Sequence, residues 1–349
     1  MREESHTDPL TLMASFFAAF LVGLQFWGLA DVGYGKTAKG SVLPTSCLRS
    51  NEDPTTRVLN GREAKRLIEQ LENDKLEWTE FAETLASVTQ LTDEAARVLS
   101  QFEGELWLVA VGSLSETQAQ ALAQHKGPLF LDGLTSLSDS VAANLAHHKS
   151  DENCLTPSNL SLNGVRQLSE AAAESFSGHQ GQLSLGLTEL SSTQAKQLSK
   201  HEGGLLLNQM TTLSDGVAEN LARSEGTLSL TGLRSVNDAQ LSSLAKHDGP
   251  LNLNGLLVLS DAAATALSEH EGGALSLNGL TSLSAVQAES LIRHQEALWL
   301  QGLTSMSDET AHILSKFNRR LYIEIGRLRE SCVEIIHESR KPNGYFREQ

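Results

Sequence analysis

Apolar and polar residues alternate in a short pattern that recurs along most of the chain. The stretch AKHDGPLNLNGL, residues 245–256, has close copies in AQHKGPLFLDGL and SEHEGGALSLNGL. Aligned on the L-x-L pair, the units are spaced by 22 to 24 residues, with one spacing of 31. The units start at Leu106, Leu129, Leu160, Leu183, Leu205, Leu228, Leu251, Leu275, Leu298 and Leu321. A period in the twenties predicts a solenoid of short strands and helices.

Each unit combines a strand pattern with a helix pattern. L-x-L has the strand period of two, so we expect Leu251 and Leu253 to point inward and Asn252 outward. Asn-Gly pairs then predict turns, with the glycine at positive φ. L-x-x-L-S-D follows with helical spacing, and its serine predicts an N-cap. Complete capping boxes are expected at Ser115 to Gln118, Ser191 to Gln194 and Ser284 to Gln287. The insertion at 147–159 predicts a loop.

The segment LFLDGLTSLSDSVAANLAHHK resembles the cysteine-containing class of leucine-rich repeats, in a 23-residue, bacterial-like variant. The resemblance covers residues 83–326 and implies an α/β horseshoe that recognises proteins and catalyses no reaction. The chain departs from the family at the ladder position, usually Asn or Cys. Leucine stands there, after a glycine, at Leu134, Leu233, Leu256, Leu280 and Leu303. We therefore expect the family's side-chain ladder to be absent.

The repeat pattern also suggests the boundaries of the chain's segments. We expect a tail at 1–9, a transmembrane or signal segment at 10–30, a flexible tether at 31–55, an N-terminal cap with a degenerate first repeat at 56–105, repeats at 106–320 and a C-terminal cap at 321–349. The amphipathic run at 62–73 with KLEWTEF at 75–81 suits the N-terminal cap. Its first strand could use Leu76 and Trp78 or lie nearer Leu85.

Residues 10–30 differ in kind from the repeats. They contain 21 residues without a charge, enough to cross about 30 Å of hydrocarbon as a helix. A retained anchor, a cleaved signal peptide and a buried core helix are the three interpretations. We expect the anchor, because the leader MREESHTD lacks the positive charge of a signal peptide. The expectation is a single-pass membrane protein with the side of the repeats open, and the alternative is a secreted or cell-envelope protein.

The composition narrows the choice of partners. The formal net charge of −16 argues against a nucleic-acid partner, which would require a basic surface. The three cysteines, Cys47, Cys154 and Cys332, have no C-x-x-C spacing, which argues against a disulfide framework and a zinc site. The run ADVGYGKT at 30–37 matches a relaxed phosphate-loop pattern, but no helix pattern follows it. We therefore expect no cofactor and no small-molecule substrate.

A histidine returns near the end of most helix patterns. The column comprises His125, His179, His201, His247, His270 and His294, and it is interrupted by Ser224, Phe102 and Phe317. Each histidine lies two residues before a helix-ending glycine or an equivalent position, so we expect the ring to bond the last carbonyls of its own helix. Neighbouring repeats should hold the rings too far apart to share a metal ion.

The outward residues of the strands remain as the candidate protein-binding face. They are Trp107, Phe130, Ser161, Ser184, Ser229, Asn252, Ser276, Trp299 and Tyr322. The aromatic residues lie at the two ends, where they would either anchor a partner or pack against the caps. The sequence thus predicts a non-catalytic, membrane-tethered scaffold that binds an unidentified protein. The alternative is an exported structural or adhesive component of the cell envelope.

Overall fold

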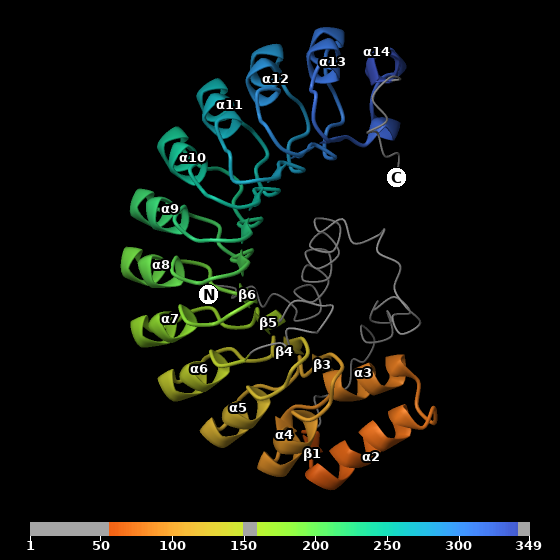
Figure 1. Ribbon diagram of the computed structural model, residues 1–349, viewed down its shortest axis with the longest axis vertical. Coiled ribbons are helices and arrows are strands. Elements are labelled where there is room, and N and C mark those ends of the chain that lie inside the picture. The colour runs from red at the N-terminus through yellow and green to blue at the C-terminus, as the bar shows by residue number, and fades with distance from the viewer. Residues whose placement is uncertain (1–55, 149–158, 341–349) are drawn as a thin grey trace, which may run out of the picture.

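The computed structural model describes residues 56–148 and 159–340. They form a horseshoe whose strands line the concave side and whose helices cover the convex side (Figure 1). The predicted α/β repeat, with parallel strands and one helix per unit, is confirmed. The predicted tail, hydrophobic segment and tether at 1–55 lie outside the described residues, as do 149–158 of the insertion and 341–349.

One parallel sheet of ten strands runs through the repeats in chain order. Its strands are β3 (Leu106–Trp107), β4 (Leu129–Phe130), β5 (Asn159–Leu162), β6 (Gln182–Leu185), β7 (Leu205–Leu206), β8 (Leu228–Ser229), β9 (Leu251–Asn252), β10 (Leu275–Ser276), β11 (Leu298–Trp299) and β12 (Leu321–Tyr322). The first leucines pair with one another throughout. Leu129 pairs with Leu160, so the register is kept across the spacing of 31 residues.

The alternation of the strands places the leucines in the core, as predicted. Leu251 and Leu253 are fully buried, and they belong to one cluster with helix residues such as Ala142 and Leu145. Burying a leucine side chain stabilises the fold by about 2 kcal/mol, whereas most strands contain only two residues. Burial of the leucines therefore contributes more to the stability of the fold than the backbone hydrogen bonds of these short strands.

A short helix follows nearly every strand. These helices are α4 (Asp93–Leu99), α5 (Glu116–Leu122), α6 (Asp139–Leu145), α7 (Glu170–Phe176), α8 (Ser192–Leu198), α9 (Asp215–Leu221), α10 (Asp238–Leu244), α11 (Asp261–Ser268), α12 (Ala285–Leu291) and α13 (Asp308–Ser315). The three predicted capping boxes are present, and a fourth joins Asn237 to Gln240. The Gln118 amide also donates to the carbonyl of Leu91 (2.8 Å), so the caps bond successive repeats.

The N-terminal end is built differently from the repeats. Strand β1 (Val58–Leu59) pairs only with β2 (Gln90–Leu91) among the described strands, apart from the ten-stranded sheet. Helix α2 (Gly61–Glu72) packs beside α4 and continues the outer row, and α3 (Trp78–Ala86) lies against β3. Trp78 therefore begins a helix, and the first strand lies upstream of both positions considered from the sequence.

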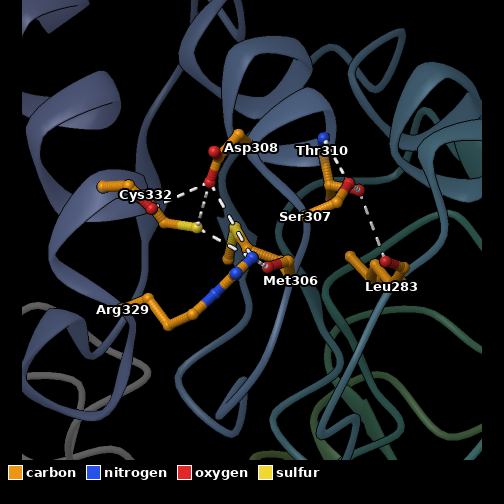
Figure 2. A network of polar contacts seen from close by, with 8 residues as sticks. Leu283, Met306, Ser307, Asp308, Thr310, Arg329 and Cys332 are labelled. Carbon is orange, nitrogen blue, oxygen red and sulfur yellow. Dashed lines mark hydrogen bonds and ion pairs between the residues drawn. The ribbon is translucent and has the colours of Figure 1, made fainter.

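The C-terminal end replaces the next repeat with a 3₁₀ turn, η3 (Ile325–Arg327), and helix α14 (Glu330–Arg340). Figure 2 shows the polar contacts that attach it to α13. Arg329 donates to the carbonyl of Met306 (2.8 Å), and the buried thiol of Cys332 lies 3.5 Å from that carbonyl and from Asp308. Ser331 and Cys332 bond the Asp308 carboxylate, which lowers the pKa of Asp308.

The expected single-pass membrane placement needs correction. Within 56–148 and 159–340, no helix is both long enough and apolar enough to cross a membrane, because the helices there have at most 12 residues. The segment on which the expectation depended, residues 10–30, lies outside the described part of the chain. The described residues therefore give the single-pass placement no support.

Candidate protein-binding face and buried histidine column

The outward residues form one column on the concave sheet. The register pairs Trp107 with Phe130, Ser161 with Ser184, Ser276 with Asn252, and Trp299 with Tyr322. Phe130 also pairs with Ser161, and Leu206 pairs with both Ser184 and Ser229. Asn252 pairs with Ser229, and Trp299 pairs with Ser276. The structure thus brings together all nine residues of the candidate face, one on each of nine strands.

The serines of this column are less accessible than alternation alone suggests. We expect outward residues to be exposed, but Ser184, Ser229 and Ser276 are only 7%, 4% and 0% exposed. A serine side chain is short, and the neighbouring strands lie only about 4.8 Å away on either side. Each hydroxyl also donates to a side chain of the preceding repeat, so these serines form the floor of the concave face.

The acceptors of these bonds form a second column, which we call the polar ladder. It consists of Asp132, Asn163, Asn208 and Asn254, which accept from serine hydroxyls, and of Asn278, which accepts from the backbone N–H of Gln301 (2.8 Å). Asn254 is typical: its Oδ1 accepts from the Ser276 hydroxyl (2.6 Å) and from the backbone N–H of Asn278 (2.8 Å). The family's ladder is absent from its usual position, as expected, but this second ladder was not expected from the sequence. The leucines at the family's usual ladder position are core residues, and the polar ladder lies two residues earlier.

Asp132 is the one carboxylate in the ladder. Its Oδ1 accepts from the Ser161 hydroxyl (2.6 Å) and the Asn163 backbone N–H (2.8 Å). Although the residue as a whole is half-buried, its carboxylate is enclosed. Burial raises the pKa of Asp132, and the hydrogen bonds from Ser161 and Asn163 oppose the rise. Loss of hydration destabilises the ionised carboxylate more than these hydrogen bonds stabilise it.

The aromatic residues at the two ends have different surroundings. Trp107 and Phe130 stack with ring centroids 3.9 Å apart, are buried, and form a cluster with Trp78 and Ala82 of α3. At this end the packing alternative holds. Trp299 and Tyr322 stack equally closely, at 3.7 Å, but both are only half-buried.

The histidines occupy the interior of the solenoid. The histidine column comprises His125, His148, His179, His201, His247, His270 and His294, each at most 1% exposed. The expected role is only partly right, because the backbone N–H of each histidine bonds its own helix, as His247 does with Leu244 (3.0 Å), while the ring points inward. His148 joins the column although the sequence pattern placed it in the insertion. Ser224 interrupts it, as predicted.

The rings stack on one another from repeat to repeat. Successive centroids lie 5.4 to 6.4 Å apart with interplanar angles of 4° to 30°. Nε2 of His148 donates to the Gly127 carbonyl (3.0 Å), and Nε2 of His247 to that of Gly226 (2.9 Å). Most other ring nitrogens have no aligned partner. Within the described residues, no group of three or more metal-binding side chains could hold an ion.

Burial keeps these imidazoles neutral. It lowers the pKa of His125 and His148 to about 4 and that of His179 to about 3, because the charged form loses its hydration. Burial lowers the pKa of His201, His247, His270 and His294 as well, while nearby backbone carbonyls oppose the shift.

Two columns of glycine allow the repeats to approach closely. A Cβ on Gly249, beside the histidine column, would lie 1.9 Å from the Gly226 carbonyl oxygen, and one on Gly255, beside the polar ladder, 2.2 Å from that of Thr231. The expected positive φ in the Asn-Gly turns is wrong, since among the described glycines only Gly181, Gly226 and Gly273 have it. Glycine occupies these turns because no side chain fits.

Comparisons with known proteins give few matches. No family model matches the chain, and no curated protein matches it either. The matching solved structures include an internalin from Listeria monocytogenes, 12% identical over 79% of this chain and 92% of that one, with a TM-score of 0.39. They also include a chain of the Toll–Spatzle complex from Drosophila, 12% identical over 69% of this chain and 37% of that one, with a TM-score of 0.34.

The class of the protein follows from its own geometry. One short parallel strand and one helix per unit, with inward leucines and an outer row of helices, define an α/β solenoid of leucine-rich-repeat type. The assignment to the cysteine-containing subclass stays a prediction.

Proposed function

We propose that this protein is a non-catalytic scaffold whose concave sheet binds another protein. The observation that carries the proposal is the continuous column of outward residues across ten strands in register. A surface of this kind is preformed, because the core leucines and the polar ladder fix each strand against the next. A partner can therefore bind with little loss of conformational entropy in the scaffold.

The serines and histidines that could act in catalysis have structural roles, which supports a non-catalytic function. The serines that begin the helices accept hydrogen bonds from their own helices, as Ser214 does from Val217 (3.3 Å). The histidine column is sealed in the core, with the rings stacked on one another. A serine nucleophile needs a base such as histidine beside it. Ser224, which lies in the histidine column, is buried, and its hydroxyl donates to the Leu221 carbonyl (2.7 Å). The net charge of −16 favours a protein partner over a nucleic acid.

The two ends of the face suggest where a partner lies. Helix α3 covers Trp107 and Phe130, so the proposed face extends from Ser161 toward the C-terminal end. Trp299 and Tyr322 offer a stacked, half-buried pair of the residue types that commonly dominate binding energy. The buried serines supply a flat floor between these ends. Half-buried side chains one position before the first leucines, such as Gln182 and Thr227, border this floor.

The test places charge on the face without disturbing the ladder. Gln182→Lys, Thr227→Arg and Ala297→Arg, combined, add charge at three half-buried positions of the concave side. We expect cross-linked partners recovered by the wild-type chain to be lost with this variant, because a bulky desolvated charge opposes docking.

The matched control adds the same charges to the convex side at three exposed positions, with Gln124→Lys, Ser242→Arg and Ala239→Arg. Thermal melts of all three proteins confirm folding. Loss of partners with the convex set, but not with the concave set, would refute the proposed face. Recovery of only the chain itself, with concentration-dependent sedimentation, would favour the adhesive or structural alternative.

A further inference from the structure

The histidine column joins the repeats in a way that the proposed function does not require. Seven buried imidazoles extend from His125 to His294 and leave one gap at Ser224. The same position holds Phe102, partly buried, at one end and Phe317, buried, at the other. A phenylalanine would fill the position with no titratable nitrogen, yet histidine occupies it in seven repeats.

The buried column offers no well-aligned acceptor for the second N–H of a protonated ring. A neutral imidazole has one donor and one acceptor nitrogen, whereas an imidazolium has two donors. Both nitrogens of His125, His179, His201 and His294 lack an aligned partner, so an added proton meets at most a poorly oriented backbone carbonyl, which offsets only part of the cost of burying the charge. The neighbouring ring lies only 5.4 to 6.4 Å away, so two protonated neighbours also repel each other.

Carboxylates flank only part of the column. Glu202 acts on His201, Asp248 on His247 and His270, and Glu296 on His294, and each favours the imidazolium. All three carboxylates are exposed, so water screens them. The charged neighbours of His125 and His179 are other histidines, which oppose protonation.

We propose that the histidine column is an acid-sensitive lock, which holds adjacent repeats together while its rings are neutral and opens the array when they take up protons. When adjacent repeats separate, the imidazolium rings become hydrated, whereas in the closed stack they are buried away from water. Because each repeat contacts only its neighbours, a break at one pair of rings exposes the next pair.

The direction of the pH effect follows from linkage. Burial lowers the pKa of each histidine in the folded chain, whereas in the unfolded chain the pKa stays near 6.5. Below about pH 6.5 the unfolded chain therefore binds more protons than the folded chain. The stability contributed by the neutral column is complete above that pH and is lost as the pH falls toward the folded values, about 3 to 4 for His125, His148 and His179. Each histidine reduces the folding equilibrium constant by up to about tenfold per pH unit in this window.

The experiment measures proton uptake on unfolding of the full chain. Urea titrations followed by circular dichroism, from about pH 7.5 to about pH 4.5, give the folding equilibrium constant at each pH. We expect about four to six protons to be taken up near pH 6, well above the range in which ordinary carboxylates titrate. An uptake of one proton or fewer in the wild-type chain would overturn the proposal.

Two variants localise the effect. His247→Phe with His270→Phe should reduce the uptake by about two protons, since these rings supply two of the titrating groups. The control, His147→Phe with His312→Phe, changes two exposed histidines and should leave the uptake unchanged. If the phenylalanine pair does not fold, the same two positions are changed to serine, the residue already present at 224. Equal uptake by the buried variant and the wild type would refute the assignment to the column.

Discussion

The polar ladder and the histidine column both run from repeat to repeat, but they satisfy their polar groups in different ways. In the ladder, the side-chain oxygen of Asn254 accepts two hydrogen bonds from the next repeat. In the column, His179 and His201 stack without an aligned partner for any ring nitrogen. An amide does not titrate, so the ladder should hold across a wide pH range, whereas the column should hold only while its rings are neutral.

Substitution of glycine should have the largest effect, and it should affect both columns alike. Gly249→Ala and Gly255→Ala each place a methyl group within 2.2 Å of a backbone oxygen in the preceding repeat. Because backbone must move to admit it, we expect each variant to lose about 3 kcal/mol of unfolding free energy in urea titrations.

Gly112→Ala is the matched control, because a Cβ at Gly112 meets nothing within 4 Å. This variant should change stability by less than about 0.5 kcal/mol. Losses of similar size in all three variants would mean that close approach of the repeats is not the reason for glycine.

Removal of one ladder amide should have a smaller effect that does not depend on pH. Asn254→Ala leaves the Ser276 hydroxyl and the Asn278 N–H without their acceptor, which costs about 2 kcal/mol. Urea titrations should give the same loss at about pH 7.5 and about pH 5.5, whereas the effect of the His247 and His270 substitutions changes between these values. A loss that doubles on acidification would remove the distinction between the columns.

The smallest expected effect concerns the ladder's one carboxylate. Burial raises the pKa of Asp132, so the folded chain binds its proton more readily than the unfolded chain. Acid therefore strengthens this site, in the direction opposite to the histidines. Asp132→Asn should stabilise the fold by about 1 kcal/mol near neutral pH, and the gain should vanish as the pH falls toward the ordinary aspartate value. The control Glu189→Gln removes the charge of an exposed carboxylate and should change stability little, whereas a destabilised Asp132→Asn protein would contradict the assignment.

The local periods of the sequence were sufficient to predict most of the fold. Alternation located Leu251 and Leu253 in the core, and Ser-x-x-Gln spacing located three capping boxes, because these features depend on residues close together in the chain. The fourth box was missed because asparagine replaces serine at Asn237. The strand β1 was also missed, since Val58–Leu59 carries no L-x-L pattern, although the amphipathic run at 62–73 coincides with α2.

The candidate sites depended on contacts between repeats, which local periods do not contain. A histidine just after a helix can bond the last carbonyls through its ring or through its backbone N–H. Only packing between repeats determines that the ring points inward and the N–H makes the bond. In the same way, alternation gives the direction of Ser276 but not its burial beneath Asn254. The cover of Trp107 and Phe130 depends on α3, which belongs to the cap and to no repeat.

The glycine columns also bear on how the chain can change in length over evolution. Gly203, Gly226 and Gly249 each lie against the backbone of the equivalent glycine one unit earlier. A unit that carries this glycine therefore presents the same backbone contact that it receives, so a recombination event that duplicates or deletes one such unit leaves the glycine contacts intact. An event of any other length would shift the glycines out of register and place a side chain against a backbone oxygen. The number of repeats is thus free to vary, although the length of the stacked unit is fixed.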